Sequence, residues 1–88
     1  MIVKFFVSKT CPKCPKVKDF FNELKKKVLF NDLEIYDQVM DRHQFIFHDV
    51  MSVPTVIVCM DDLTETERYV GFEEIMNNKE NIECLETR

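Results

Sequence analysis

The sequence predicts a single α/β domain, spanning residues 1–88, in which a four-stranded mixed sheet carries helices on both faces. Three observations predict this fold. Short β-prone runs alternate with stretches of helical periodicity in the order β-α-β-α-β-β-α, which is typical of β-α-β units. The last two β-prone runs are separated only by a tight turn, as in a β-hairpin. The 88 residues are 45% hydrophobic, enough for one domain with a modest core.

The first half of the chain predicts a β-α-β unit. Residues 2–7 form a continuous β-prone run, rich in Val, Ile and Phe, of the kind found in buried central strands. A helix is expected from about residue 15 to residue 30, because apolar residues recur there at helical spacing. These residues are Val17, Phe20, Phe21, Leu24 and Val28. Residues 33–37 alternate between apolar and polar and predict a second strand, which should pair with the first in parallel through a right-handed crossover.

Two prolines lie near the start of this first helix. Pro12 suits the first helical position, where its missing N–H is not needed. Pro15 disfavours helical backbone at the residue before it and removes one early hydrogen bond, so the sequence leaves open whether the helix begins at Pro15 or only after it.

The second half of the chain predicts one helix and a hairpin. The helix is expected from Asp41, as its N-cap, to about Met51. Residues 55–60 are the strongest strand signal after the first strand, and residues 65–70 alternate weakly. A tight turn joins these two strands, which should therefore be antiparallel.

The only glycine of the chain, Gly71, marks a position where special backbone geometry is expected. It follows the last predicted strand and precedes a third helix that begins at about residue 72. The polar residues 77–81 leave the end of that helix open.

Charge is spread unevenly along the chain. The net charge is −4, yet residues 1–18 carry five lysines and no acidic residue, so the rest carries 7 basic and 16 acidic residues, a net of −9. A basic end on an acidic protein predicts an anionic partner near that end. Nucleic acid is not expected, because there is no arginine patch and the acidic bulk would repel phosphate. The five lysines are Lys4, Lys9, Lys13, Lys16 and Lys18.

No targeting or membrane segment is expected. The apolar residues 1–7 are too short for a signal peptide and lack a charged leader and a cleavage site. No run approaches the roughly 18 apolar residues of a membrane span. We therefore expect a cytoplasmic protein, and in that reducing compartment a cysteine pair is more often catalytic or metal-binding than structural.

Cys11 and Cys14 form a C-x-x-C motif between the first strand and the first helix. The unpaired N–H groups and the dipole at a helix start favour a thiolate, and Lys9 and Lys13 add positive charge. Such surroundings lower the pKa of a thiol from about 8.5 to roughly 3.5–7.5. The first cysteine is expected at the exposed end of the turn and the second to be shielded. Cys11 is therefore assigned as the nucleophile, and Cys14 as the residue that resolves the mixed disulfide.

A metal site is the alternative interpretation of the same cysteine pair. Zinc or an iron–sulfur cluster could be held there, with zinc completed by Cys59 and Cys84 or by His43 and His48. There is no second C-x-x-C motif, and the two histidines lie five residues apart, off a shared helical face. Cys59 ends a buried strand, where a free cysteine packs as a small hydrophobe. A redox-inactive adaptor on the same scaffold is a third possibility.

The segment 5–14, Phe-Phe-Val-Ser-Lys-Thr-Cys-Pro-Lys-Cys, resembles the active-site segment of glutaredoxins and related thioredoxin-like redoxins. The segment 52–56, Ser-Val-Pro-Thr-Val, is similar to a second landmark of these proteins, and Gly71 to a third. The three occur in the expected order over nearly the whole chain. The resemblance implies a thioredoxin-like fold and a cis bond between Val53 and Pro54. It also implies that Pro54 faces the cysteines and that the Val53 backbone pairs with an extended substrate.

The resemblance further implies a thiol–disulfide oxidoreductase that reduces protein disulfides, acts as a monomer without a bound cofactor, and is recycled by a reductase or by glutathione. Lys13 stands where glutaredoxins usually carry an aromatic residue, whereas residues 70–72 are closer to thioredoxins. If glutathione binds, Lys9, Lys13 and the Val53 backbone are expected to hold its carboxylates and peptide groups. The expected substrate-binding residues are Lys9, Pro12, Lys13, Val53, Pro54, Gly71 and Phe72.

Overall fold

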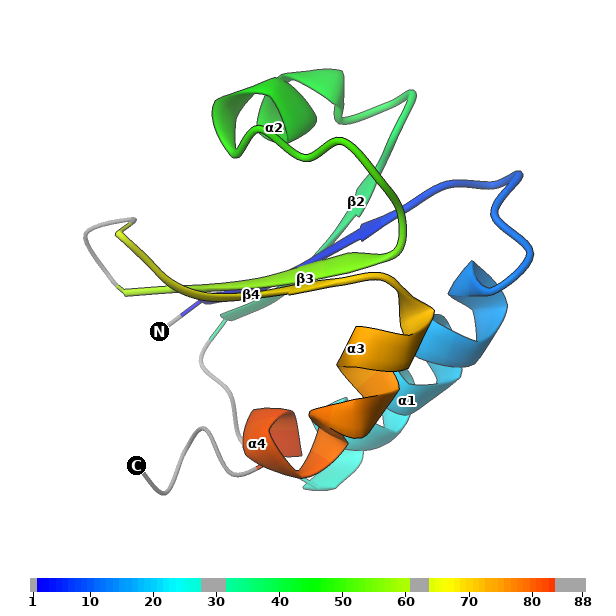
Figure 1. Cartoon of the computed structure of the whole chain (residues 1–88), viewed down its shortest axis with the longest axis vertical. Coiled ribbons are helices and arrows are strands. Elements are labelled where there is room, and N and C mark those ends of the chain that lie inside the picture. The colour runs from blue at the N-terminus through cyan, green and yellow to red at the C-terminus, as the bar shows by residue number, and fades with distance from the viewer. Residues whose placement is uncertain (1, 28–31, 61–63, 84–88) are drawn as a thin grey trace.

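The computed structural model describes residues 2–27, 32–60 and 64–83 (Figure 1). The elements are β1 (Ile2–Val7), α1 (Cys14–Lys27), β2 (Asp32–Asp37), α2 (Arg42–Phe47), β3 (Thr55–Cys59), β4 (Glu65–Val70), α3 (Phe72–Asn77) and α4 (Lys79–Glu83). The predicted order is confirmed, and the C-terminal helical region consists of two short helices. No helix within these ranges is long and apolar enough to cross a membrane.

The four strands form one mixed sheet in the order β2-β1-β3-β4, so β2 and β4 are its edges. β1 and β2 are parallel, as expected for strands joined through a helix, and β3 and β4 form the predicted antiparallel hairpin. β1 also pairs with β3 in the antiparallel direction. Figure 1 shows α1, α3 and α4 on one face of the sheet and α2 on the other. The predicted fold class is therefore confirmed.

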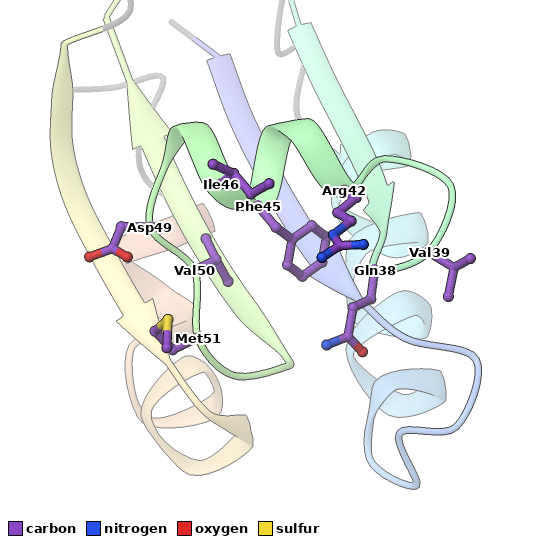
Figure 2. Close-up of a pocket in the computed structure, with 8 residues that line it drawn as sticks. All are labelled: Gln38, Val39, Arg42, Phe45, Ile46, Asp49, Val50 and Met51. Atoms are coloured by element: carbon purple, nitrogen blue, oxygen red, sulfur yellow. The ribbon is translucent and has the colours of Figure 1, made fainter.

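Alternate side chains of β1 supply the core on the two faces of the sheet, because successive strand residues point in opposite directions. On the side of α1, Phe5 packs against Phe21 with 4.0 Å between ring centroids. On the side of α2, Phe6 meets Phe45 edge to face at 4.9 Å. Figure 2 shows Phe45 projecting from α2 towards the sheet. Phe5, Phe6 and Phe21 are fully buried.

The start of α1 differs from the prediction. The helix begins at Cys14, one residue before the expected start, and Pro12 lies in the turn ahead of it rather than at the first helical position. Pro15 is the second helical residue, where a backbone N–H would have no intrahelical partner in any case. The predicted continuation over residues 28–30 lies outside the described residues.

The predicted end of the second helix, at about Met51, is wrong. α2 ends at Phe47, and the backbone then turns away through Asp49, whose φ of +53° is left-handed. The N–H of Val50 donates to the carbonyl of Phe45 at 2.8 Å, which closes the helix. The apolar residues after residue 47 therefore belong to the connection between α2 and β3.

Two carboxylates hold the connection between β2 and α2. Asp41 occupies the predicted N-cap position, but its carboxylate accepts the N–H of Asp37 at 2.9 Å and makes no hydrogen bond to the helix. The Asp37 carboxylate accepts the N–H groups of Val39 and Met40 at 2.9 and 3.0 Å. These two hydrogen bonds lower the pKa of Asp37.

Lys4 does not belong to the basic surface that the lysine-rich end predicts. Its side chain is only 4% exposed and lies between the sheet and α2. The ammonium donates to Oε1 of Gln44 at 3.3 Å and to Nε2 of His48 at 2.9 Å, and it lies 5.5 Å from the ring centroid of Tyr36. The other four lysines of this segment are exposed.

Candidate active site

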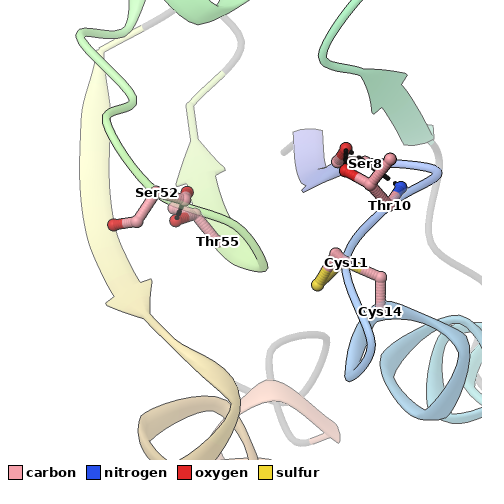
Figure 3. The surroundings of a disulfide bond; sticks show 6 residues. All are labelled: Ser8, Thr10, Cys11, Cys14, Ser52 and Thr55. Atoms are coloured by element: carbon pink, nitrogen blue, oxygen red, sulfur yellow. Dashed lines mark hydrogen bonds between the residues drawn. A yellow bond between two sulfur atoms is a disulfide. The ribbon is translucent and has the colours of Figure 1, made fainter.

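A short turn joins the end of β1 to the C-x-x-C motif. The N–H of Cys11 donates to the carbonyl of Ser8 at 3.2 Å, and the N–H of Thr10 donates to Oγ of Ser8 at 3.3 Å. The hydroxyls of Ser8 and Thr10 lie 3.1 Å apart and share a hydrogen bond (Figure 3). The turn therefore holds Cys11 at the end of the sheet, just ahead of α1.

The two cysteines of the motif form a disulfide, with their Cα atoms 5.4 Å apart. Their exposure is unequal, as the sequence predicts. Cys14 lies in the first turn of α1 and is 1% exposed. Cys11 precedes the helix and is partly exposed. Cys11 is therefore more open to a large substrate than Cys14 is.

The loop before β3 faces the cysteines across the site (Figure 3). The bond between Val53 and Pro54 is cis, which confirms the expectation drawn from the resemblance. The hydroxyl of Thr55 donates to the carbonyl of Ser52 at 2.8 Å and closes the loop. The carbonyl of Pro54 accepts the N–H of Gly71 at 2.8 Å, which ties the loop to the start of α3.

Gly71 has the special backbone conformation that its isolation in the sequence predicts. Its φ of +91° and ψ of 157° fall in a region that is essentially restricted to glycine. A Cβ built at this position would meet no heavy atom within 4 Å outside its two neighbours in the chain. The requirement for glycine therefore comes from the backbone and not from crowding.

The cysteine loop, the cis-proline loop and the start of α3 enclose a groove of about 450 Å³. We call it the redox groove. Its lining residues are Cys11, Pro12, Lys13, Val53, Pro54, Val70, Gly71, Phe72, Glu73 and Glu74. All but one of the expected substrate-binding residues meet here. The exception is Lys9, which lines a separate hollow of about 370 Å³ on the other side of the disulfide, together with Lys18.

The sequence reasoning missed three lining residues, Val70, Glu73 and Glu74. The Glu74 carboxylate accepts the N–H of Val70 at 2.8 Å. The sequence did contain a signal for this wall, because Glu73 and Glu74 are two acidic residues in the first turn of the helix that follows Gly71. On the opposite wall, the Lys13 ammonium lies 5.1 Å from the ring centroid of Phe72, within the range of a cation–π contact. The groove thus has a basic wall and an acidic wall.

The alternative metal ligands that the structure describes are not gathered around the disulfide. Among the residues that the structure describes, no three His, Cys, Asp or Glu side chains form a group that could hold a metal ion. Cys59 is fully buried in β3, and burial raises the pKa of its thiol. His48 accepts a hydrogen bond from Lys4, while His43 is exposed on α2. Cys84 lies outside the described residues.

Comparisons with known proteins agree with this geometry. A family model described as a thioredoxin domain matches residues 1–71. A probable thioredoxin of Methanothermobacter marburgensis is 36% identical over 61 residues, covering 66% of this chain and 72% of the relative. A probable thioredoxin of Methanothermobacter thermautotrophicus is 33% identical over 57 residues, covering 64% and 67%. The solved structure of thioredoxin 1 from Thermosipho africanus TCF52B superposes with a TM-score of 0.75, at 22% identity and full coverage of both chains, and supports the fold.

Proposed function

The chain belongs to the thioredoxin family and is a thiol–disulfide oxidoreductase, and on that premise we propose that it reduces disulfides in proteins, with Cys11 attacking and Cys14 resolving. The unequal burial of the two cysteines carries this assignment of roles. Cys11 is partly exposed and lines the redox groove, whereas Cys14 is 1% exposed. A substrate disulfide therefore reaches Cys11 first, and Cys14 is the neighbouring thiol that can attack Cys11 from within the protein.

The proposed reaction has two exchange steps. First, the Cys11 thiolate attacks one sulfur of the substrate disulfide, so that this bond breaks and a disulfide between Cys11 and the substrate forms. The other substrate sulfur leaves as a thiolate and takes a proton from water. Next, Cys14 gives up its proton to solvent and its thiolate attacks the sulfur of Cys11. The bond between Cys11 and the substrate breaks, the second substrate sulfur leaves as a thiolate and takes a proton from water, and a disulfide between Cys11 and Cys14 forms. Two electrons have then passed to the substrate.

The redox groove supports a polypeptide as the substrate. Val53 lies before the cis proline and lines the groove, and we propose that its backbone pairs with an extended substrate segment in the manner of strand addition. We assign Pro12, Lys13, Gly71 and Phe72 to the walls that hold this segment. Lys9 contributes positive charge from the hollow on the other side of the disulfide.

The family acts on disulfide substrates together with a reductase, and we propose that a reductase dithiol returns two electrons to this disulfide. Glutathione is the second candidate reductant, and Lys9 and Lys13 would then bind its carboxylates. The proposed enzyme is a monomer that needs no bound cofactor. The cytoplasm, where thiols are kept reduced, suits this chemistry.

Reduction of insulin by the purified protein tests the proposal, with recycling by thioredoxin reductase and by glutathione with its own reductase in parallel assays. We expect Cys11→Ser to abolish turnover and Cys14→Ser to accumulate a mixed disulfide that mass spectrometry detects. Exposed Ser52→Cys in a Cys11→Ser background controls for a thiol placed near the groove without the motif. Turnover that survives Cys11→Ser would refute the assignment. Stoichiometric zinc or iron in protein purified without reductant would favour the metal-binding alternative.

A further inference from the structure

Lys4 is a buried charge that the proposed reaction does not use. A buried ammonium group is costly unless its hydrogens find partners, and this one reaches from β1 to the polar groups at the end of α2. It donates to Oε1 of Gln44 at 3.3 Å and to Nε2 of His48, the residue that follows α2, at 2.9 Å. The side chain of His48 is therefore tied to a central strand of the sheet.

A second cation holds the main chain of the same residue from another strand. Arg68 of β4 donates to the carbonyl of His48 and, at 3.2 Å, to the carbonyl of Asp49. The carboxylate of Glu65 accepts hydrogen bonds from the Arg68 guanidinium at 2.7 and 3.0 Å and thereby orients it. His48 is thus held through its ring by Lys4 and through its carbonyl by Arg68. We call these three residues the His48 clamp.

The His48 clamp lies at the start of the connection that carries the cis-proline loop. Figure 2 shows this connection leaving α2, passing Asp49 beside β4 and continuing to the start of β3. It then reaches Val53 and Pro54, which line the redox groove. The far end of the connection is held by the hydrogen bonds of Thr55 and Pro54 described above. Residues 48–54 are therefore fixed at both ends.

The position of α2 depends on these contacts with the sheet. The helix has six residues and buries one of its side chains, Phe45, which packs against Phe6. Helices shorter than about 12 residues are not stable by themselves in water. Without the His48 clamp, the beginning of the connection would rely mainly on the packing of these rings.

We propose that Lys4 and Arg68 are positioning residues for the polypeptide substrate, because they hold His48 and so fix the connection that presents the Val53 backbone at the redox groove. This inference rests on the proposed function. A backbone segment that must become ordered when it pairs with a substrate weakens binding, and the His48 clamp supplies this order in advance. Neither cation lines the redox groove, so each acts through the connection.

Single-turnover reduction of two disulfides tests the proposal. The first substrate is a polar, extended peptide whose only cysteine forms a mixed disulfide with a coloured aromatic thiol. The second is the symmetrical disulfide of that aromatic thiol, which has no backbone to pair with Val53. In both cases attack by the Cys11 thiolate releases the aromatic thiolate, so absorbance follows the same leaving group. Titration of reduced protein with the peptide gives a limiting rate and a half-saturating concentration.

Lys4→Met keeps the length of the side chain and removes its hydrogen-bond donors. It should raise the half-saturating concentration of the peptide about three- to tenfold at an unchanged limiting rate, because the loss is one of binding. Arg68→Met should act in the same direction, and since Arg68 is only partly buried, this variant decides the question if Lys4→Met does not fold. Both variants should reduce the small disulfide at the wild-type rate. His48→Gln keeps an acceptor for Lys4 and should bind the peptide as the wild type does, whereas His48→Leu should behave like Lys4→Met.

Two control variants separate positioning from a general loss of stability. Lys79→Met is the same substitution on the other face of the sheet, where the Lys79 ammonium lies 5.3 Å from the ring centroid of Phe20 (Figure 1). Ile82→Val shortens a fully buried side chain of α4 and lowers stability without touching the His48 clamp. Both should keep the wild-type half-saturating concentration at a temperature where circular dichroism shows every variant folded.

The proposal is overturned if the folded clamp variants bind the peptide as tightly as the wild type does, or if Ile82→Val weakens binding as much as Lys4→Met. Slower reduction of the small disulfide by Lys4→Met would also overturn it, since the effect would then lie at Cys11 itself. Failure of the proposed function looks different. In that case the wild type reduces the small disulfide but not the peptide, whereas equal peptide reduction by all variants removes only the role of the His48 clamp.

Discussion

Replacement of Gly71 by alanine should destabilise the protein although the added methyl group meets no atom. The backbone at this position has a φ of +91° and a ψ of 157°. Holding a residue other than glycine in this region costs about 1–3 kcal/mol. Outside Gly71 and its two neighbours in the chain, no heavy atom lies within 4 Å of the point that the methyl carbon would occupy, so contacts with the rest of the fold add nothing to that figure. For a domain of this size, each kcal/mol lowers the Tm by about 4–8 °C, which predicts a loss of at least about 4 °C.

Urea unfolding of the oxidised protein, followed by circular dichroism, measures this effect. Gly71→Asn is the informative companion, because asparagine tolerates left-handed backbone with φ near +57° and ψ near +47°. That tolerance does not extend to a ψ of 157°, so asparagine should destabilise the protein about as much as alanine does. A loss below about 0.5 kcal/mol for alanine, or a return to wild-type stability with asparagine, would refute the reasoning.

Three further predictions concern single side chains. His48 is 6% exposed, and its pKa is lowered mainly by burial and next by the nearby charge of Lys4. The imidazole of His48 therefore binds a proton more readily in the unfolded protein than in the folded protein. The stability that this provides is complete above about pH 6.5 and is lost as the pH falls below that value; the unfolding free energy should drop from pH 7.5 to pH 5, and less so in His48→Gln. Lys13→Met should slow the attack of Cys11 on a small disulfide at pH 7 by about two- to fivefold, the effect of one exposed charge, whereas an unchanged rate in stopped-flow assays would separate Lys13 from the reaction. Thr55→Val should cost about 1 kcal/mol in urea unfolding, because the hydroxyl that donates to Ser52 is lost, and an equally stable variant would contradict the role given to that hydrogen bond.

The fold could be predicted from the sequence because the patterns that indicate strands, helices and turns all agree with one fold. The run at residues 2–7 is apolar except for Lys4, and in the structure it lies inside the sheet, which has helices on both faces. The cis bond at Pro54 was accessible only through the resemblance, since local sequence does not separate a cis proline from an ordinary proline at the start of a strand.

The features that were not predicted from the sequence depend on contacts between residues that are far apart in the chain. The predicted end of α2 was wrong because the apolar residues after Phe47 continue the helical pattern, while the backbone turns at Asp49. Lys4 was counted with the other lysines of the basic end, because charge along a sequence does not reveal that Gln44 and His48 will cover it. The local sequence pattern predicts helices and strands, whereas the burial of a single charged side chain depends on which residues lie next to it in the fold.

The hydrogen bond from Val70 to the Glu74 carboxylate has a consequence for behaviour in concentrated solution. β4 is an edge strand, and an edge presents unpaired backbone groups on which another chain can build a continuous sheet. Near the redox groove, Glu74 occupies the N–H of Val70. Further along the strand, the side chains of Glu65 and Arg68 form an ion pair at 2.7 Å. A second copy that docked here would have to displace a carboxylate and desolvate these charges, so the strand is guarded against the edge-to-edge association that leads to aggregates.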